Sequence, residues 1–454
     1  AMAVIGLVGC LALAVLLPFA EDGSIAFDPG TAKWSWDTRG IQDKGYTENV
    51  VDLMVAKLSG LPVETQKALQ QLACLGNVAD VTILSIVLGT SEAQVHADLS
   101  EAVRLELVER LAGSYKFIHD RVQEAAYVLI PEASRAEAHL RIGRLLAAQT
   151  PVEKREEAIF EIVNQLNRGV PLITSQDERE QMAELNLLAG QRAKASTAYA
   201  SALTYLIAGA ALLAEDCWER RHALIFALEL LRAECEVLTG AMAAAEHRLT
   251  RLSTHAATTV ERATVACLRM DVYTYLAQSG RAVAVGLNYL RHLGIDWSPH
   301  PTDEDVRRAY ERIWAQLGGR AIEELLELPL MTDPASLATL DVLIKLGQST
   351  RFTDANLFAL TICTAVHLSL ERGNSDGSCY AYVRLGTVAG VHFGDYQAGY
   401  RFGQLGYDLV EKHGLKRFQV RTYAIFGNAV MPWTRHVKAG RDLVRRAFEM
   451  AHQT

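Results

Sequence analysis

The residues with the clearest potential for chemistry are consecutive: His119, Asp120 and Arg121. A histidine beside a carboxylate could transfer protons, but only in a cleft with a partner group that the sequence does not identify. We therefore expect structural roles. Asp120 would cap the following helix, His119 would form a hydrogen bond across the junction, and Arg121 would pair with an acid such as Glu124. An enzyme that uses His119 and Asp120 is an alternative hypothesis.

The three residues lie where a strand pattern passes into a helix pattern. Apolar residues alternate through Tyr115 and Phe117, and Val122, Ala125 and Ala126 then recur at helical spacing. The triplet is therefore predicted to connect a strand to a helix.

The phosphate-loop, zinc-protease and protein-kinase motifs do not occur in the sequence. The dipeptide Gly-Lys is absent, which excludes a G-x-x-x-x-G-K-[ST] phosphate loop, and H-E-x-x-H, H-R-D and D-F-G are absent as well. The 7 cysteines show no C-x-x-C spacing, which argues against zinc and is typical of a reducing cytoplasm. We predict no catalytic residue, metal or cofactor in this chain, and a cytoplasmic location.

Composition indicates a large, mainly helical chain. The 454 residues are enough for two to four structural units, half of them are hydrophobic, and only 11 are proline. The net charge of −8 gives no general attraction to nucleic acid or to an anionic membrane.

Two segments precede the predicted folded modules. Residues 1–19 form an apolar segment, which is either a membrane span or a buried or aberrant chain start; we expect no membrane partner. Residues 20–60 form a connector in which residues 25–27 are a short strand and residues 28–30 a turn. Trp34 and Trp36 lie on one face of a second extended stretch, before Asp37, and are predicted to clamp the connector onto the next unit.

Residues 61–130 have the element order of a winged helix. One helix begins near Pro62, a second covers residues 80–88, a third runs from Ser91 through Ala102, and a hairpin covers residues 105–118. The segment holds nine acidic and five basic residues, an excess of four negative charges, and its third helix has no Lys or Arg. Because groove entry requires phosphate neutralisation, we interpret the module as a protein-interaction element.

Residues 131–454 show helix after helix, interrupted at spacings typical of helix-pair solenoids. Predicted breaks include Gly240, Gly280 and Gly414, and glycines between residues 386 and 406 indicate close helix contacts. The fold class is therefore mainly α: a winged-helix-like module followed by a TPR-like α-helical solenoid. A basic run near the end is predicted to be a solvated face, or alternatively a docking surface for an acidic partner; it comprises Lys416, Arg417, Arg421, Arg435, Lys438, Arg441, Arg445 and Arg446.

Residues 115–127 closely resemble the F-x-H-D-R-V-Q-x-A-A-Y signature of very large bacterial signalling proteins. In that family a STAND-type (AAA-like) ATPase is followed by a helical region and by kinase or cyclase output domains. Further similarity to the family occurs before this segment, at the connector, and after it, at His139, at residues 164–167 and at residues 393–403. These segments have the same order along the chain as in the family. The sequence departs from the family at its start, where residues 1–17 are apolar. The matching junction residues are Phe117, His119, Asp120, Arg121, Gln123 and Tyr127, and the matching connector residues are Trp34, Trp36 and Asp37.

The resemblance implies a non-catalytic regulatory segment of a parent protein that combines a Ser/Thr kinase-like domain, an ATPase, a sensor and a histidine-kinase output. ATP and magnesium would bind only in those parent domains. The implied partners are the intramolecular ATPase and kinase domains, with a protein or small-ligand signal on the solenoid and no nucleic acid. The junction motif would pass nucleotide state to the helical arm. A winged-helix transcription regulator with a helical sensor arm is the alternative.

Overall fold

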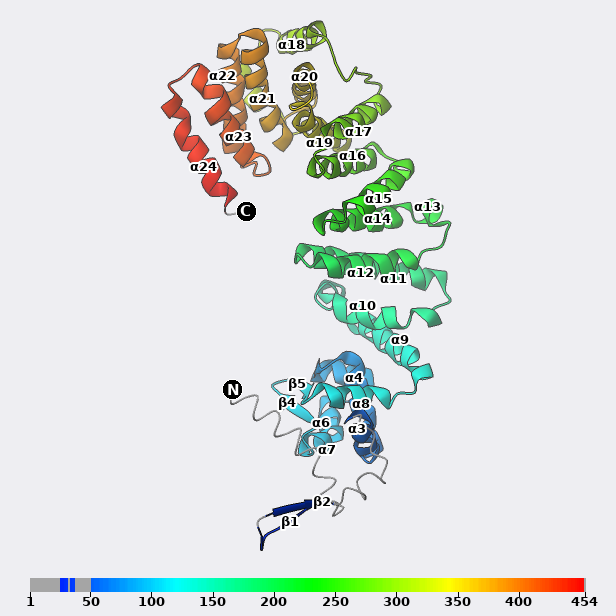
Figure 1. The fold of residues 1–454 in the computed structure, drawn as a ribbon. Helices are drawn as coiled ribbons and strands as arrows, with labels where there is room; N and C mark the ends of the chain where they lie inside the picture. Colours follow the sequence, from blue (N-terminus) through cyan, green and yellow to red (C-terminus); the bar gives the residue numbers. More distant parts are fainter. Residues whose placement is uncertain (1–24, 32, 37–49, 453–454) are drawn as a thin grey trace. The chain divides into compact units, whose positions relative to one another are not determined.

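The computed structural model describes residues 25–31, 33–36 and 50–452, and nearly all of their secondary structure is helical (Figure 1). Contacts divide the chain into two units, Ala1–Arg192 and Ala193–Thr454. The predicted boundaries at residues 19, 60 and 130 stay predictions. The apolar segment 1–19 and Asp37 lie outside the described residues. Among the described helices, none is long and apolar enough to cross a membrane.

A short antiparallel hairpin forms the described part of the connector. Strand β1 (Ile25–Asp28) pairs with β2 (Lys33–Trp36), with Ile25 opposite Trp36. The Asp28 carboxylate accepts hydrogen bonds from Gly30 N at 2.8 Å and from Thr31 Oγ1 at 2.7 Å, which closes the turn. The predicted strand and turn are therefore confirmed. The clamp formed by Trp34 and Trp36 stays a prediction, because their side chains lie outside what the structure describes.

Residues 50–130 form a helix–hairpin module around its own core. The elements follow in the order that the winged-helix prediction requires, and that classification stays a prediction. A three-stranded antiparallel sheet has the order β3-β5-β4. The elements are α3 (Val50–Ser59), α4 (Val63–Leu75), β3 (Val78–Asp80), α5 (Val81–Leu88), α6 (Glu92–Asp98), α7 (Ser100–Arg104), β4 (Val108–Leu111), β5 (Ser114–Phe117) and α8 (Asp120–Val128).

The predicted third helix is broken in two at Leu99. Ser91 caps α6 as expected, accepting from Gln94 N, but the helix ends at Asp98. There the buried Thr65 hydroxyl donates a hydrogen bond to the Asp98 carbonyl oxygen at 2.7 Å. A side chain of α4 therefore satisfies a backbone carbonyl next to the break. The short helix that follows ends at Arg104, which lies beyond the predicted helix.

Three further helices complete the first unit: α9 (Glu132–Gln149), α10 (Ile159–Arg168) and α11 (Gln176–Ala195), the last of which crosses the unit boundary. Helices α9 and α10 pack closely because Gly143 lies against Leu166; a Cβ at Gly143 would be 2.7 Å from the Leu166 side chain. Helix α10 ends at Arg168 with Gly169 as its C-cap, and α9 also packs on α5 of the module.

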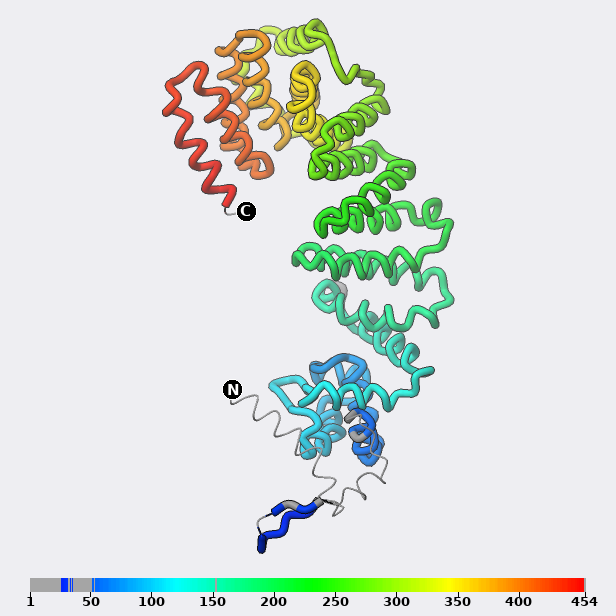
Figure 2. Tube along the Cα trace, viewed as in Figure 1, coloured from blue at the N-terminus to red at the C-terminus, as the bar shows by residue number. Residues whose placement is uncertain are grey.

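The second unit is a stack of helices in which most helices pack on a helix one or two places along the chain, and this architecture confirms the predicted α-helical solenoid (Figure 2). Its α-helices are α12 (Tyr199–Ala211), α13 (Cys217–Arg220), α14 (His222–Leu238), α15 (Met242–His255), α16 (Thr259–Tyr275), α17 (Ser279–His292), α18 (Asp303–Leu317), α19 (Pro334–Thr350), α20 (Ala355–Arg372), α21 (Asp376–Phe393), α22 (Tyr396–His413), α23 (Gln419–Ile425) and α24 (Arg441–Ala451). A π-helical turn, η4 (Phe426–Val430), follows α23.

Glycines allow a close helix contact in this stack, between α21 and α22. A Cβ at Gly386 would lie 2.6 Å from the Gly399 carbonyl oxygen, and a Cβ at Gly399 would lie 2.6 Å from that of Gly386. The predicted close contacts are therefore confirmed. The predicted break at Gly280 is wrong, because Gly280 lies inside α17; the chain turns instead at Ala277, whose φ is +55°.

The basic run near the end is partly neutralised from distant segments. Arg417 pairs with Asp341 at 2.8 Å, and Arg446 pairs with Glu411 at 3.1 Å. The Arg435 guanidinium lies 5.1 Å from the centre of the Tyr400 ring. Asp341, Glu411 and Tyr400 belong to earlier helices, so the residues around the basic run do not reveal these partners.

Candidate functional site at the strand–helix junction

Strand β5 brings the signature segment into the module core. It pairs on both sides, with Val78 opposite Lys116 and Val108 opposite Phe117. The alternation of a strand therefore buries Tyr115 and Phe117 and leaves Lys116 exposed. Helix α8 follows directly and packs on α3 and α4, so the whole signature is fixed to the module.

His119 caps α8, and the predicted cap by Asp120 is wrong. His119 has an extended backbone, and its Nδ1 accepts a hydrogen bond from Arg121 N at 3.1 Å. The predicted hydrogen bond of His119 across the junction is thus replaced by this local one. Asp120 is already the first helical residue, where an exposed carboxylate is favoured by the positive end of the helix dipole.

The remaining surface residues of the signature have modest roles. Arg121 Nη1 lies 2.7 Å from Glu124 Oε2, which confirms the predicted pair. Both side chains are about half exposed, so the pair contributes about 0.5 kcal/mol or less. Gln123 is half-buried on the same helix.

At the other end of α8, Tyr127 begins a chain of hydrogen bonds that leaves the signature. The Tyr127 hydroxyl lies 2.9 Å from His139 Nε2, and His139 Nδ1 lies 2.6 Å from Gln165 Oε1. Gln165 Nε2 in turn donates to the carbonyl oxygen of Cys74 at 2.8 Å. We call these four groups the junction network. It connects α8, α9, α10 and the end of α4.

The junction network fixes the protonation of its histidine. Because the Gln165 amide donates to the Cys74 carbonyl, its oxygen faces His139, so Nδ1 carries the proton and Nε2 accepts from Tyr127. His139 is only 1% exposed. Burial lowers the pKa of His139, the Gln165 hydrogen bond partly opposes this, and the positive charge of Arg168 lowers it further. A neutral imidazole therefore fits the site.

Two arginines of α9 support the same junction. Arg141 donates to the Val87 carbonyl at 3.0 Å and to Gln71 Oε1 at 2.6 Å, which ties α9 to α5 and α4. The Arg135 guanidinium lies 4.9 Å from the centre of the Tyr127 ring, within cation–π range. The first helix of the predicted solenoid is thus held by polar contacts on several elements of the module.

The predicted signature residues separate into two groups. Phe117 is fully buried in the module core, and Tyr127 packs against that core. The triplet that begins at His119 lies at the opposite end of α8, about 10 Å away along a helix axis at 1.5 Å per residue. The structure therefore does not bring the triplet and Tyr127 into one site.

Gln165 and Arg141 are two residues of the junction whose roles were not predicted from the sequence. Gln165 is 5% exposed on a helix whose other buried residues are all apolar, including Ile162 and Leu166. A glutamine at such a position requires hydrogen-bond partners, and this was the available signal. Arg141 offered no comparable signal, since its acceptors lie 54 and 70 residues away.

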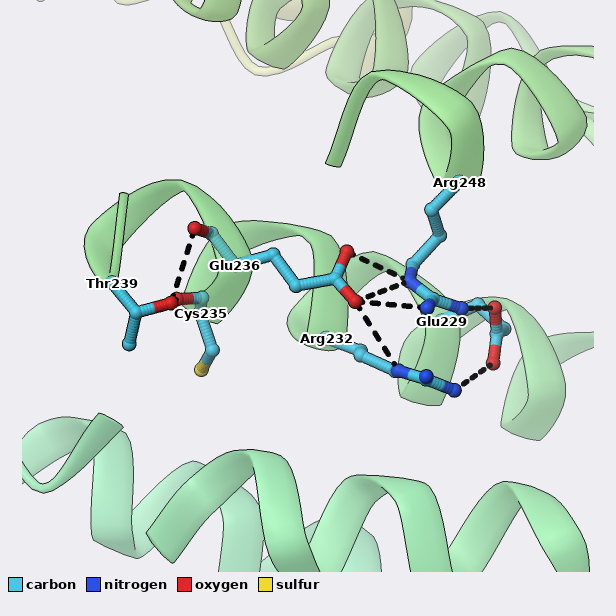
Figure 3. A network of polar contacts seen from close by, with 6 residues as sticks. All are labelled: Glu229, Arg232, Cys235, Glu236, Thr239 and Arg248. Atoms are coloured by element: carbon cyan, nitrogen blue, oxygen red, sulfur yellow. Dashed lines mark hydrogen bonds and ion pairs between the residues drawn. The ribbon is translucent and has the colours of Figure 1, made fainter. Parts of the chain in front are cut away.

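A second polar network lies between α14 and α15 in the second unit (Figure 3). Arg248 of α15 forms hydrogen bonds with Glu236 at 2.8 and 2.9 Å and also with Glu229, and Arg232 lies 3.4 and 3.7 Å from the same two acids. The side chains are 7–24% exposed. Among the described residues no group of three or more His, Cys, Asp or Glu side chains could hold a metal.

Comparisons with known proteins give a sequence relative and a structural neighbour. No family model matches the chain. Over 512 aligned residues it is 24% identical to hybrid signal transduction histidine kinase G of Dictyostelium discoideum, covering 94% of this chain and 15% of that protein. The chain thus spans about 15% of the length of this relative. A STAND protein with a tetratricopeptide repeat sensor from Pyrococcus horikoshii aligns with 13% identity and a TM-score of 0.36, covering 90% of this chain and 60% of that one.

Proposed function

We propose that the chain is a regulatory segment of a larger signal-transduction protein and contributes no catalytic residue itself. The helical region receives a protein or small-ligand signal, and the junction network passes the change to the helix–hairpin module. That module acts on an ATPase and a kinase output outside these residues. The observation that carries the proposal is the buried chain of hydrogen bonds from Tyr127 through His139 and Gln165 to Cys74.

The sequence comparison supports the setting. The relative is a hybrid signal transduction histidine kinase, and it aligns along nearly the whole of this chain while most of its own length lies outside the alignment. A segment that corresponds to 15% of such a protein has the size expected of one regulatory region among several domains.

The junction network supplies a physical means of transmission. If α10 moved away from α4, the Cys74 carbonyl and the Gln165 amide would be left buried without partners. Each unsatisfied buried group costs about 1–3 kcal/mol. Helix α10 and the end of α4 are therefore expected to move together, and a signal that favours one position of α10 would shift the module by its differential affinity for the two states.

We assign the module to protein contact and not to DNA. Helix α6 carries Glu92 and Asp98 and no Lys or Arg, and Arg104 at the end of α7 is paired with Glu101. Apolar side chains are exposed on the module surface at Val63 and Ile118. A module of this charge, with exposed apolar residues, suits an ATPase core or a similar protein surface. Salt-dependent DNA binding by the chain would support the transcription-regulator alternative.

The first experiment tests the absence of catalysis. The purified 454-residue chain is incubated with labelled ATP and magnesium, and nucleotide binding and autophosphorylation are measured. We expect neither. Robust ATP binding or phosphoryl transfer by the chain alone would overturn the proposal.

A second experiment tests transmission through the junction. In Gln165→Leu, amide hydrogen exchange is expected to increase in α4 as well as in α10, because the Cys74 carbonyl loses its donor. The matched control is Gln181→Leu, at an exposed position of α11. Unchanged exchange in α4 in the Gln165 variant would show that the network transmits nothing to the module.

A further inference from the structure

A small cavity in the second unit is lined by cationic and polar side chains. It has a volume of about 60 Å³ and lies where α15, α16 and α17 adjoin. Its floor is apolar and buried, formed by Val265 and Ala266. The other lining residues are Ser253, Arg262, Arg269, Val285, Asn288, Tyr289 and His292.

The helical repeat places the polar residues together. Arg262 and Arg269 are seven residues apart on α16, and Asn288 and His292 are four apart on α17, so each pair lies on one helix face. His292 Nδ1 lies 2.7 Å from the Asn288 carbonyl oxygen, which orients its ring. Tyr289 is committed elsewhere, because its hydroxyl lies 2.8 Å from Thr339 Oγ1.

The two arginines carry charge that the surrounding protein does not neutralise. Neither Arg262 nor Arg269 forms an ion pair or a side-chain hydrogen bond within the described parts of the chain, and no carboxylate lines the cavity. The Nε of Arg269 is buried without a partner. The acids of the same helix are engaged elsewhere: Glu261 with His222 and the helix cap, and Asp271 with Lys345.

Two larger cavities differ because carboxylates line them. The one that includes Lys345 and Arg417 also contains Asp271 and Asp341, which pair with them. In the other, Arg144 is paired with Glu178 and Glu184 is a second carboxylate of the lining, although the Nε of Arg155 is buried there without a partner. The cavity on α16 thus combines an unneutralised positive charge with a buried donor that lacks an acceptor, and buried donors are normally satisfied.

We propose that this cavity binds a phosphoryl group. Guanidinium groups match the oxygens of phosphate, and two arginines with an amide match a doubly charged tetrahedral anion. At roughly 10–15 Å³ for each water-sized occupant, the cavity has room for about four to six such occupants, which is enough for a phosphate group. The group belongs either to a small phosphate compound or to a phosphorylated side chain of a protein. The cavity is separate from the junction network, so the two proposals are tested by different measurements.

The test uses inorganic phosphate as the probe. Binding to the 454-residue chain is measured by calorimetry and by the shift of the unfolding temperature, against sodium chloride at the same ionic strength. We expect phosphate to stabilise the chain beyond chloride. Arg262→Gln and Arg269→Gln should each weaken phosphate binding about tenfold, since a charged hydrogen bond contributes about 1.5 kcal/mol or more.

Arg445→Gln is the matched control, because it removes one exposed arginine charge on α24, away from the cavity lining. Circular dichroism confirms that each variant is folded. A phosphoserine peptide, compared with its unphosphorylated form, distinguishes the sources: tighter binding than free phosphate identifies a protein ligand, and equal binding a small compound. Stabilisation no greater than that by chloride, or equal losses in Arg445→Gln, would overturn the proposal.

Discussion

The Tyr127 hydroxyl connects the end of α8 to His139 on α9. In Tyr127→Phe the ring is kept, but His139 Nε2 remains buried without its donor. We expect the free energy of unfolding to fall by about 1–3 kcal/mol, measured by urea denaturation. Tyr275→Phe is the control, since Tyr275 is 67% exposed, and should change it by less than about 0.5 kcal/mol. Equal effects of the two substitutions would contradict the role of the hydroxyl.

His139 also makes stability depend on pH. Its pKa in the folded chain lies below the ordinary value of 6.5, so the unfolded chain takes up a proton more readily. Stability is therefore expected to decrease as the pH falls below about 6.5 and to be unaffected by this residue above that value. Burial also lowers the pKa of His367 and of His392, so the wild-type chain shows their contributions too.

The comparison of His139→Gln with the wild type isolates the contribution of His139 to the pH dependence of stability. Urea denaturation at pH 7.5 and at pH 5.5 should show a smaller loss of stability in His139→Gln. The exposed His413→Gln should keep the wild-type loss. A variant at position 139 with the full wild-type pH dependence would show that this histidine is not responsible.

Contacts between residues close in the chain could be predicted from the sequence, and contacts between distant residues could not. The Arg121–Glu124 pair follows from helical spacing alone. The cap of α8 was assigned to Asp120 because carboxylates are common caps, but the extended backbone at His119 places the helix start one residue earlier. The partners of Tyr127 come from later helices, so no local pattern specifies them.

At the scale of elements, the contact between α21 and α22 depends on the absence of side chains. In Gly399→Ala the new Cβ would meet a backbone oxygen, which cannot move aside as a flexible side chain could. We expect a loss of about 1–3 kcal/mol in the free energy of unfolding. Gly280→Ala is the matched control in α17, where nothing lies within 4 Å of the added atom, and it should be neutral or stabilising by up to about 1 kcal/mol.

Helix ends were predictable where a residue at the end determines them. Helix α5 ends at Leu88 as predicted, with Gly89 in the left-handed conformation, whereas Asp80, predicted as its first residue, instead caps it from the end of β3. Strand β3 was not predicted, because it has three residues and exists only through its pairing with β5, which lies 34 or more residues later. At the break at Leu99, the Asp98 carbonyl likewise accepts a hydrogen bond from Thr65 of another helix.

At the scale of the whole molecule, the second unit is stabilised mainly through neighbouring helices. In such a stack a local loss of stability spreads by nearest-neighbour contacts. Gly399→Ala is therefore expected to increase amide hydrogen exchange most in α21 and α22, less in α19 and least in α14. Exchange is measured by mass spectrometry on peptides from each helix. A uniform increase through all helices of the unit would contradict the stacked, neighbour-dependent architecture.

The charged network between α14 and α15 bears on how such a stack can evolve. Its two acids and one arginine belong to α14, and Arg248 belongs to α15. A helix inserted or exchanged alone would leave a buried charge without its partner, at a cost of about 3–5 kcal/mol. Recombination that preserves the fold must therefore copy or remove these two helices together, which makes the α14–α15 hairpin a unit of inheritance.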